Sequence, residues 1–196
     1  HAGEDFNHIV TGMRKVHETV KFYGMSDKDR LGHALAMGLN PKEWCELNGD
    51  IFVTKQEHLD NLVWLYHQSI EVLPYYKNTD KLREKYARVI KELYSYIYIP
   101  KSQKQENQKQ ELSCEIEDIY KAWKLREFCP IVVFSEDEML NEADEYLKIA
   151  NFDSEKLCKE EYKKAKKIYH KYHTCSSVRK KGDEVITVAC GFPTTV

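Results

Sequence analysis

The segment from Lys166 to Ser177 holds two histidines and a cysteine, residue types that bind transition metals or form disulfides. His170 and His173 lie three positions apart, so on a helix they could share one face, and Cys175 follows closely. A zinc site needs further donors, and the His-Glu-x-x-His pattern of helical zinc sites is absent. We interpret the two histidines as solvated groups that interact with a helix dipole, and we predict neither a metal nor a cofactor.

The chain has six cysteines, and none of them forms the Cys-x-x-Cys pattern of zinc modules. The even number is typical of disulfides, for which the candidates are Cys45, Cys114, Cys129, Cys158, Cys175 and Cys190. Cys158 and Cys175 lie too far apart on one predicted helix to pair, and the same holds for Cys114 and Cys129. Cys45 is alone in the N-terminal half. If all six pair, Cys45 links the two halves.

Disulfides persist in oxidising compartments, so we predict a secreted, extracellular protein. Residue 1 is His rather than Met, which fits a removed signal peptide. The alternative is a cytosolic protein with six reduced thiols that pack as small apolar groups. No apolar run approaches the roughly 18 residues that span a bilayer, so we expect no transmembrane segment.

The hydrophobic pattern predicts a mostly α fold, with about eight helices packed as one disulfide-stapled globular unit. Apolar residues recur at steps of three and four in several segments, chiefly 6–23, 59–70, 82–97, 112–125 and 139–150. Further helices are expected over 26–38, from Pro41, and from about 154 to 173. The sequence 101–110 lacks apolar residues and joins the halves 1–100 and 111–196 of this single domain. The β-branched tail near residue 187 could form a short ribbon with 51–53 or 131–134.

A helical chain with six cysteines resembles the insect odorant-binding proteins, which enclose small ligands. The short gap between the second and third cysteines of that family is absent here, where Cys114 and Cys129 take those places. The resemblance therefore implies a carrier as one alternative, and it assigns no residue a role.

Enzyme signatures are missing: the chain has no Gly-x-Ser-x-Gly, no phosphate-binding glycine loop and no dinucleotide fingerprint. We therefore predict that it is not an enzyme.

With a net charge of −2, the chain has no overall positive field that would attract nucleic acid, and we expect no sequence-specific nucleic-acid binding. Lysines nevertheless crowd the last predicted helix, and tyrosine is unusually frequent. The candidate binding-patch residues are Lys163, Lys166, Lys167, Lys171, Tyr94, Tyr96 and Tyr98.

The function that these features predict is that of a secreted, non-enzymatic binding protein. It would engage a protein or polyanionic partner through a rigid helical face, as an effector or inhibitor does. The alternative is a carrier that encloses a small amphipathic ligand in a helical cavity. A large exposed aromatic or basic patch would favour the first function. A cavity lined by Tyr and Trp would favour the second, and a cleft with paired His and acidic groups would indicate an enzyme.

Overall fold

The computed structural model describes residues 1–72, 79–98, 115–125, 164, 167–168 and 185–189. This part of the chain is mostly helical, which confirms the predicted class. Its elements are α1 (Ile9–Phe22), α2 (Leu35–Gly38), α3 (Pro41–Asn48), β1 (Asp50–Thr54), α4 (Lys55–Glu71), α5 (Thr79–Tyr98), α6 (Ile116–Lys124) and β2 (Val185–Ala189). The predicted helices over 139–150 and from 154 lie wholly or largely outside the described residues, as does the segment 131–134.

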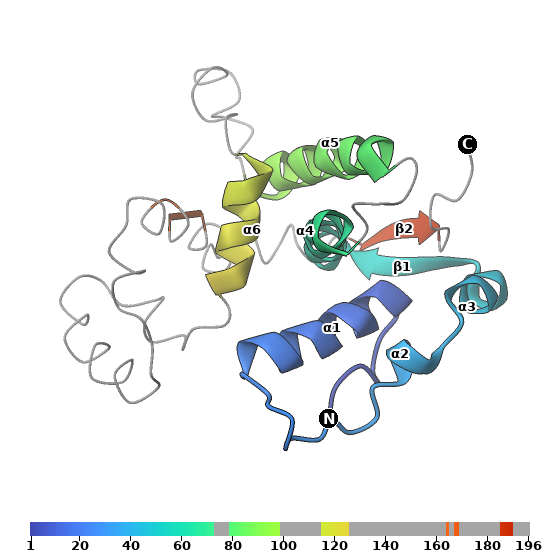
Figure 1. The fold of residues 1–196 in the computed structure, drawn as a ribbon. Coiled ribbons are helices and arrows are strands. Elements are labelled where there is room, and N and C mark those ends of the chain that lie inside the picture. The colour runs from blue at the N-terminus through green and yellow to red at the C-terminus, as the bar shows by residue number, and fades with distance from the viewer. Residues whose placement is uncertain (73–78, 99–114, 126–163, 165–166, 169–184, 190–196) are drawn as a thin grey trace, which may run out of the picture.

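Helix α4 is the centre of the packing. Figure 1 shows it nearly end-on, with α1 on one side and α5 on the other, and it contacts α6 and β1 as well. The side chains that α4 buries include Leu59, Val63 and Trp64. They meet Ile90 of α5 and Trp123 of α6 in one hydrophobic core. The core is thus made by helices that are distant in the sequence.

Local capping explains where α3 and α4 begin. The Asn40 side chain accepts a hydrogen bond from the Lys42 N–H at 3.0 Å, and Pro41 occupies the first turn. The Thr54 hydroxyl accepts from the Glu57 N–H at 3.2 Å, which fixes the start of α4. Both caps were visible as short sequence patterns.

Two predictions near the N-terminus are corrected. Helix α1 starts only at Ile9. His8 is extended and caps this helix, because its imidazole accepts a hydrogen bond from the Val10 N–H at 3.1 Å. The helix expected over 26–38 is reduced to Leu35–Gly38. The Asp29 carboxylate does accept from the Ser26 N–H at 2.7 Å, but it closes a turn rather than a helix. Left-handed backbone at His33, with a φ of 64°, interrupts any continuous helix there.

A two-stranded antiparallel ribbon joins the N-terminal half of the chain to its C-terminal end. Asp50 pairs with Ala189, and Thr54 pairs with Val185. This observation confirms the predicted short ribbon and selects 51–53 over 131–134 as the partner of the tail. Because β1 leads directly into α4, the ribbon lies against the central helix (Figure 1).

Candidate functional site

The structure places the predicted binding-patch tyrosines in different environments. Tyr94 and Tyr98 are buried, because they fall on the same α5 face as Ile90. Tyr96 is 40% exposed, and the Lys55 Nζ lies 3.8 Å from the centre of its ring. Tyr96 alone among the three stays a candidate for surface contact.

Only one of the four predicted lysines, Lys167, lies in the described residues. Lys167 is exposed. Lys163, Lys166 and Lys171 lie outside the described residues, so the basic patch stays a prediction. The same holds for His170 and His173, and for every candidate disulfide cysteine except Cys45, which lies on α3.

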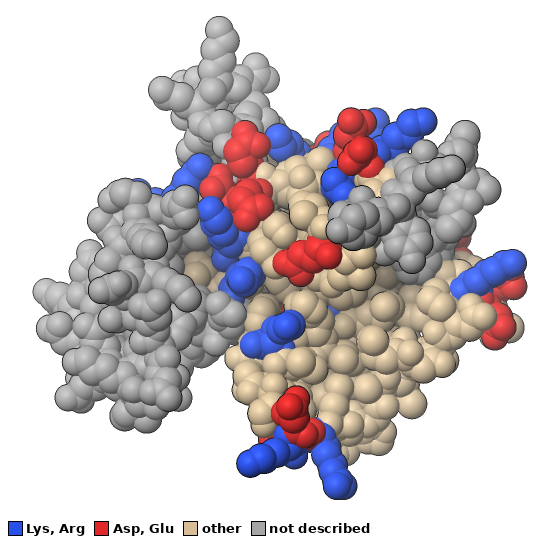
Figure 2. Space-filling model, viewed as in Figure 1, with Lys and Arg blue, Asp and Glu red and all other residues tan. Residues whose placement is uncertain are grey.

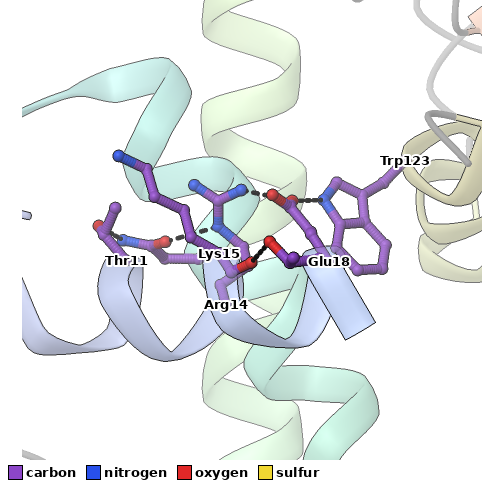
Figure 3. A network of polar contacts seen from close by, with 7 residues as sticks. Thr11, Arg14, Lys15, Glu18 and Trp123 are labelled. Atoms are coloured by element: carbon purple, nitrogen blue, oxygen red, sulfur yellow. Dashed lines mark hydrogen bonds and ion pairs between the residues drawn. The ribbon is translucent and has the colours of Figure 1, made fainter. Parts of the chain in front are cut away.

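A buried polar network ties α1 to α4 and α6. The Arg14 Nε donates to the Asn61 Oδ1 at 2.9 Å, and the Asn61 amide donates to the Thr11 hydroxyl at 2.8 Å. The Arg14 guanidinium also pairs with the Glu18 carboxylate, which accepts the Trp123 indole N–H at 3.1 Å (Figure 3). Arg14 and Asn61 are buried, so the charge is stabilised by these partners rather than by water. The network therefore fixes how α1, α4 and α6 pack against one another.

Two histidines of α4 are held neutral by their surroundings. Burial lowers the pKa of His58 to about 4, and the nearby His8 acts in the same direction. Burial likewise lowers the pKa of His67 to about 4, with a smaller contribution from Lys124. His67 stacks on Tyr120, with ring centres 3.1 Å apart. Both imidazoles therefore behave as packing groups at neutral pH.

Large apolar side chains are exposed along one stretch of the chain, from α2 to β1. Leu47 is 85% exposed and Phe52 is 67% exposed. We call this set the α2–β1 surface, and its members are Leu35, Met37, Leu39, Leu47 and Phe52. Phe52 faces outward because strand residues alternate, while its neighbour Val53 is buried. The sequence analysis missed this surface, since isolated apolar residues in short elements give no periodic signal.

The view in Figure 2 shows a broad area without Lys, Arg, Asp or Glu over the region of α1 and α2. Charged side chains lie at the borders of this area. Around α3, Lys42 and Glu46 form an exposed pair at 3.8 Å. Such a weakly charged area bordered by charged groups is typical of a surface that contacts another molecule.

A second candidate site combines three potential metal ligands. The Nδ1 of His1 lies 3.7 Å from one carboxylate oxygen of Glu4, and the Nε2 of His33 lies 3.0 Å from the other. The sequence analysis missed this group, because His33 is far from Glu4 in the chain and no helical spacing connects them. Only the histidine and carboxylate residue types could have signalled it.

No protein family matches this chain, and no curated protein matches it at a significant level. In the described ranges, none of the helices has both the length and the apolar character required to cross a membrane. A functional interpretation therefore has to be argued from the side chains themselves.

Proposed function

We propose that this chain is a secreted, non-enzymatic protein that binds a protein partner through the α2–β1 surface. The observation that supports it is the exposure of five large apolar side chains within one short stretch of chain. Contiguous apolar exposure is costly in water, and covering it on association is favourable.

The elements beneath this surface suit a rigid binding face. The cap at Asn40 holds α3, and the Gly49 N–H closes its end by donating to the Cys45 carbonyl at 3.0 Å. Phe52 is held on a paired strand, opposite Thr187 in the register. Side chains on such elements lose less conformational freedom on binding than side chains on a mobile loop.

The partner should present a complementary apolar face. Charges near α3 are of both signs, as the Lys42–Glu46 pair illustrates, so they favour no strongly charged partner. We therefore expect binding to be weakly dependent on salt, in contrast to the salt-sensitive binding that a lysine patch would give.

Photo-crosslinking tests this proposal. A benzoylphenylalanine at position 47 should give a discrete adduct in extracellular fluid of the producing organism. The same group at Tyr23, which is 83% exposed at the end of α1, serves as the control. The partner identified from the adduct is then titrated with the wild-type protein, with Leu47→Ser/Phe52→Ser, and with Tyr23→Ser/Val72→Ser.

The expected result is that Leu47→Ser/Phe52→Ser binds about tenfold or more weakly, while the control pair binds as the wild type does. Equal adducts from positions 47 and 23, or undiminished binding by Leu47→Ser/Phe52→Ser, would show that the surface is not the interface. The carrier stays an alternative prediction. Native mass spectrometry distinguishes it, because a carried ligand adds a stoichiometric mass.

A further inference from the structure

His1, Glu4 and His33 come together from two segments that are far apart in the sequence. One ligand atom of each residue lies within 4.8 Å of the others. The closest approach is 3.0 Å, between the His33 Nε2 and a Glu4 oxygen. Ligand atoms bound to one zinc ion at about 2.0–2.2 Å lie roughly 3.5 Å from one another, so small side-chain movements would suffice.

The backbone holds the two segments against each other. The Ala34 N–H donates to the Ala2 carbonyl at 3.0 Å, and the Ala36 N–H donates to the Gly3 carbonyl at 3.0 Å. Ala2 and His33 also form an isolated parallel bridge. The segment bearing His1 and Glu4 is therefore fixed beside His33 by main-chain contacts, independently of the three side chains.

The approach of the two segments has a conformational cost. His33 and Ala34 have φ values of 64° and 45°, in the left-handed region that residues with a β-carbon disfavour. At Gly3, a β-carbon would lie 2.4 Å from a methyl group of Val16, so only glycine fits. Strained backbone of this kind is concentrated at functional sites.

The donor set indicates which ions would bind. Two imidazole nitrogens and one carboxylate suit zinc and neighbouring divalent transition metals, whereas magnesium and calcium prefer oxygen donors alone. Three protein ligands leave a fourth position for water or for a group from another molecule. The site is accessible, since His1 and His33 are both exposed.

We propose that His1, Glu4 and His33 form a binding site for one divalent transition-metal ion of the zinc class. This site shares no residue with the α2–β1 surface, and it does not depend on the proposed function. Because its ligands are partly solvated and few, we expect reversible binding rather than a permanently held structural ion.

Calorimetric titration of the full chain with zinc chloride tests the proposal, after chelation and with a histidine-free tag at the C-terminal end. We expect saturation at one ion per chain. His33→Ala and Glu4→Gln should each weaken binding by at least the roughly 10–100-fold that loss of an outer-shell partner causes. Glu4→Gln keeps the shape of the side chain, so it separates loss of a ligand from loss of the fold.

The matched control is His170→Ala/His173→Ala, which removes two histidines that lie three positions apart in the sequence. It should bind zinc as the wild type does. Cobalt substitution gives a second measurement, because the visible absorption of bound Co²⁺ should vanish in His33→Ala. The proposal is overturned if no saturable binding occurs. It is equally overturned if binding survives in His33→Ala and disappears in the control variant.

Discussion

Asp50 pairs with Ala189 where β1 begins and β2 ends. Cys190 is the next residue after Ala189, and consecutive Cα atoms are about 3.8 Å apart. On the other strand, Asp50 follows Gly49, which caps the end of α3 and whose N–H donates to the Cys45 carbonyl. Ala189 therefore pairs with a residue that lies two positions beyond α3, the helix that carries Cys45.

We predict from this register that Cys45 forms a disulfide with Cys190. Two thiols would lose their hydrogens to an oxidising disulfide of the secretory pathway, which is reduced to two thiols in exchange. Cys45→Ser and Cys190→Ser should each lower the free energy of unfolding by about 2–4 kcal/mol. The double variant should lose no more than either single variant, because both remove the same bond.

Peptide mapping without reductant is the direct measurement for this disulfide. It should recover the peptide containing Cys45 linked to the one containing Cys190. Recovery of Cys45 linked to another cysteine would contradict this pairing while keeping a bridge between the two halves. Recovery of both peptides as thiols would contradict the stapled fold as well.

Gly12 provides a prediction about packing between α1 and α2. A β-carbon there would lie 2.5 Å from the Ala36 β-carbon and 2.7 Å from the Phe6 ring. In an open helix, Gly→Ala stabilises by about 1 kcal/mol, but overpacking costs about 1–3 kcal/mol. Gly12→Ala should therefore lower the free energy of unfolding by up to about 2 kcal/mol in urea titrations.

Gly38 is the matched control for Gly12. It lies in α2, and nothing stands within 4 Å of where its β-carbon would be. Gly38→Ala should leave the free energy of unfolding unchanged or raise it slightly. A Gly12→Ala protein as stable as Gly38→Ala would mean that α1 and α2 do not pack as closely as described.

Asn61 is expected to be the most sensitive member of the polar network in Figure 3. It is buried and accepts from Arg14 while donating to Thr11. Asn61→Ala leaves a buried guanidinium with one partner fewer and an unsatisfied hydroxyl. We expect a loss of about 2–3 kcal/mol in the free energy of unfolding.

An exposed ion pair gives the comparison for Asn61. Glu46→Gln removes the charge partner of Lys42 at the surface of α3. Because water screens this pair, the loss should stay below about 0.5 kcal/mol. If Asn61→Ala costs no more than Glu46→Gln, the network does not hold the three helices together.

The sequence predicts those elements whose signals are local. The caps at Asn40 and Thr54 are set by side chains within three residues of the helix start, and the α5 stripe follows from helical spacing alone. The prediction fails over 26–38, because the N–H groups of Ala34 and Ala36 donate to the carbonyls of Ala2 and Gly3 instead of to carbonyls of a preceding helical turn. No local pattern encodes such a partner.

The candidate sites follow the same division. Tyr94, Tyr96 and Tyr98 were predicted together as one candidate patch, although helical spacing puts Tyr94 and Tyr98 on the Ile90 face of α5 and Tyr96 outside it. The approach of His33 to Glu4 depends instead on main-chain pairing between distant segments. The exposure of Leu47 depends on how other parts of the chain pack around α3. Both are properties of the tertiary structure.

The buried histidines of α4 predict how stability changes with pH. Burial lowers the pKa values of His58 and His67 to about 4, whereas unfolded histidines titrate near 6.5. Between these values the unfolded chain binds protons that the folded chain excludes. The free energy of unfolding should therefore fall as the pH drops from about 6.5 toward 4. The loss by pH 5 should be roughly 1–2 kcal/mol for each histidine.

His67→Leu tests the contribution of one of these groups. The Glu117 carboxylate lies 3.4 Å from the His67 Nε2, but it is 55% exposed, so its attraction for a protonated ring is weakened by solvent. Burial therefore dominates, and His67→Leu should reduce the pH dependence between pH 7 and 5 in urea titrations. The remainder comes from the other histidines whose pKa values are lowered chiefly by burial, His8, His17 and His58. Gly38→Ala keeps all the histidines and should follow the wild-type slope. A full wild-type slope in His67→Leu would show that His67 takes up its proton equally in the folded and unfolded states.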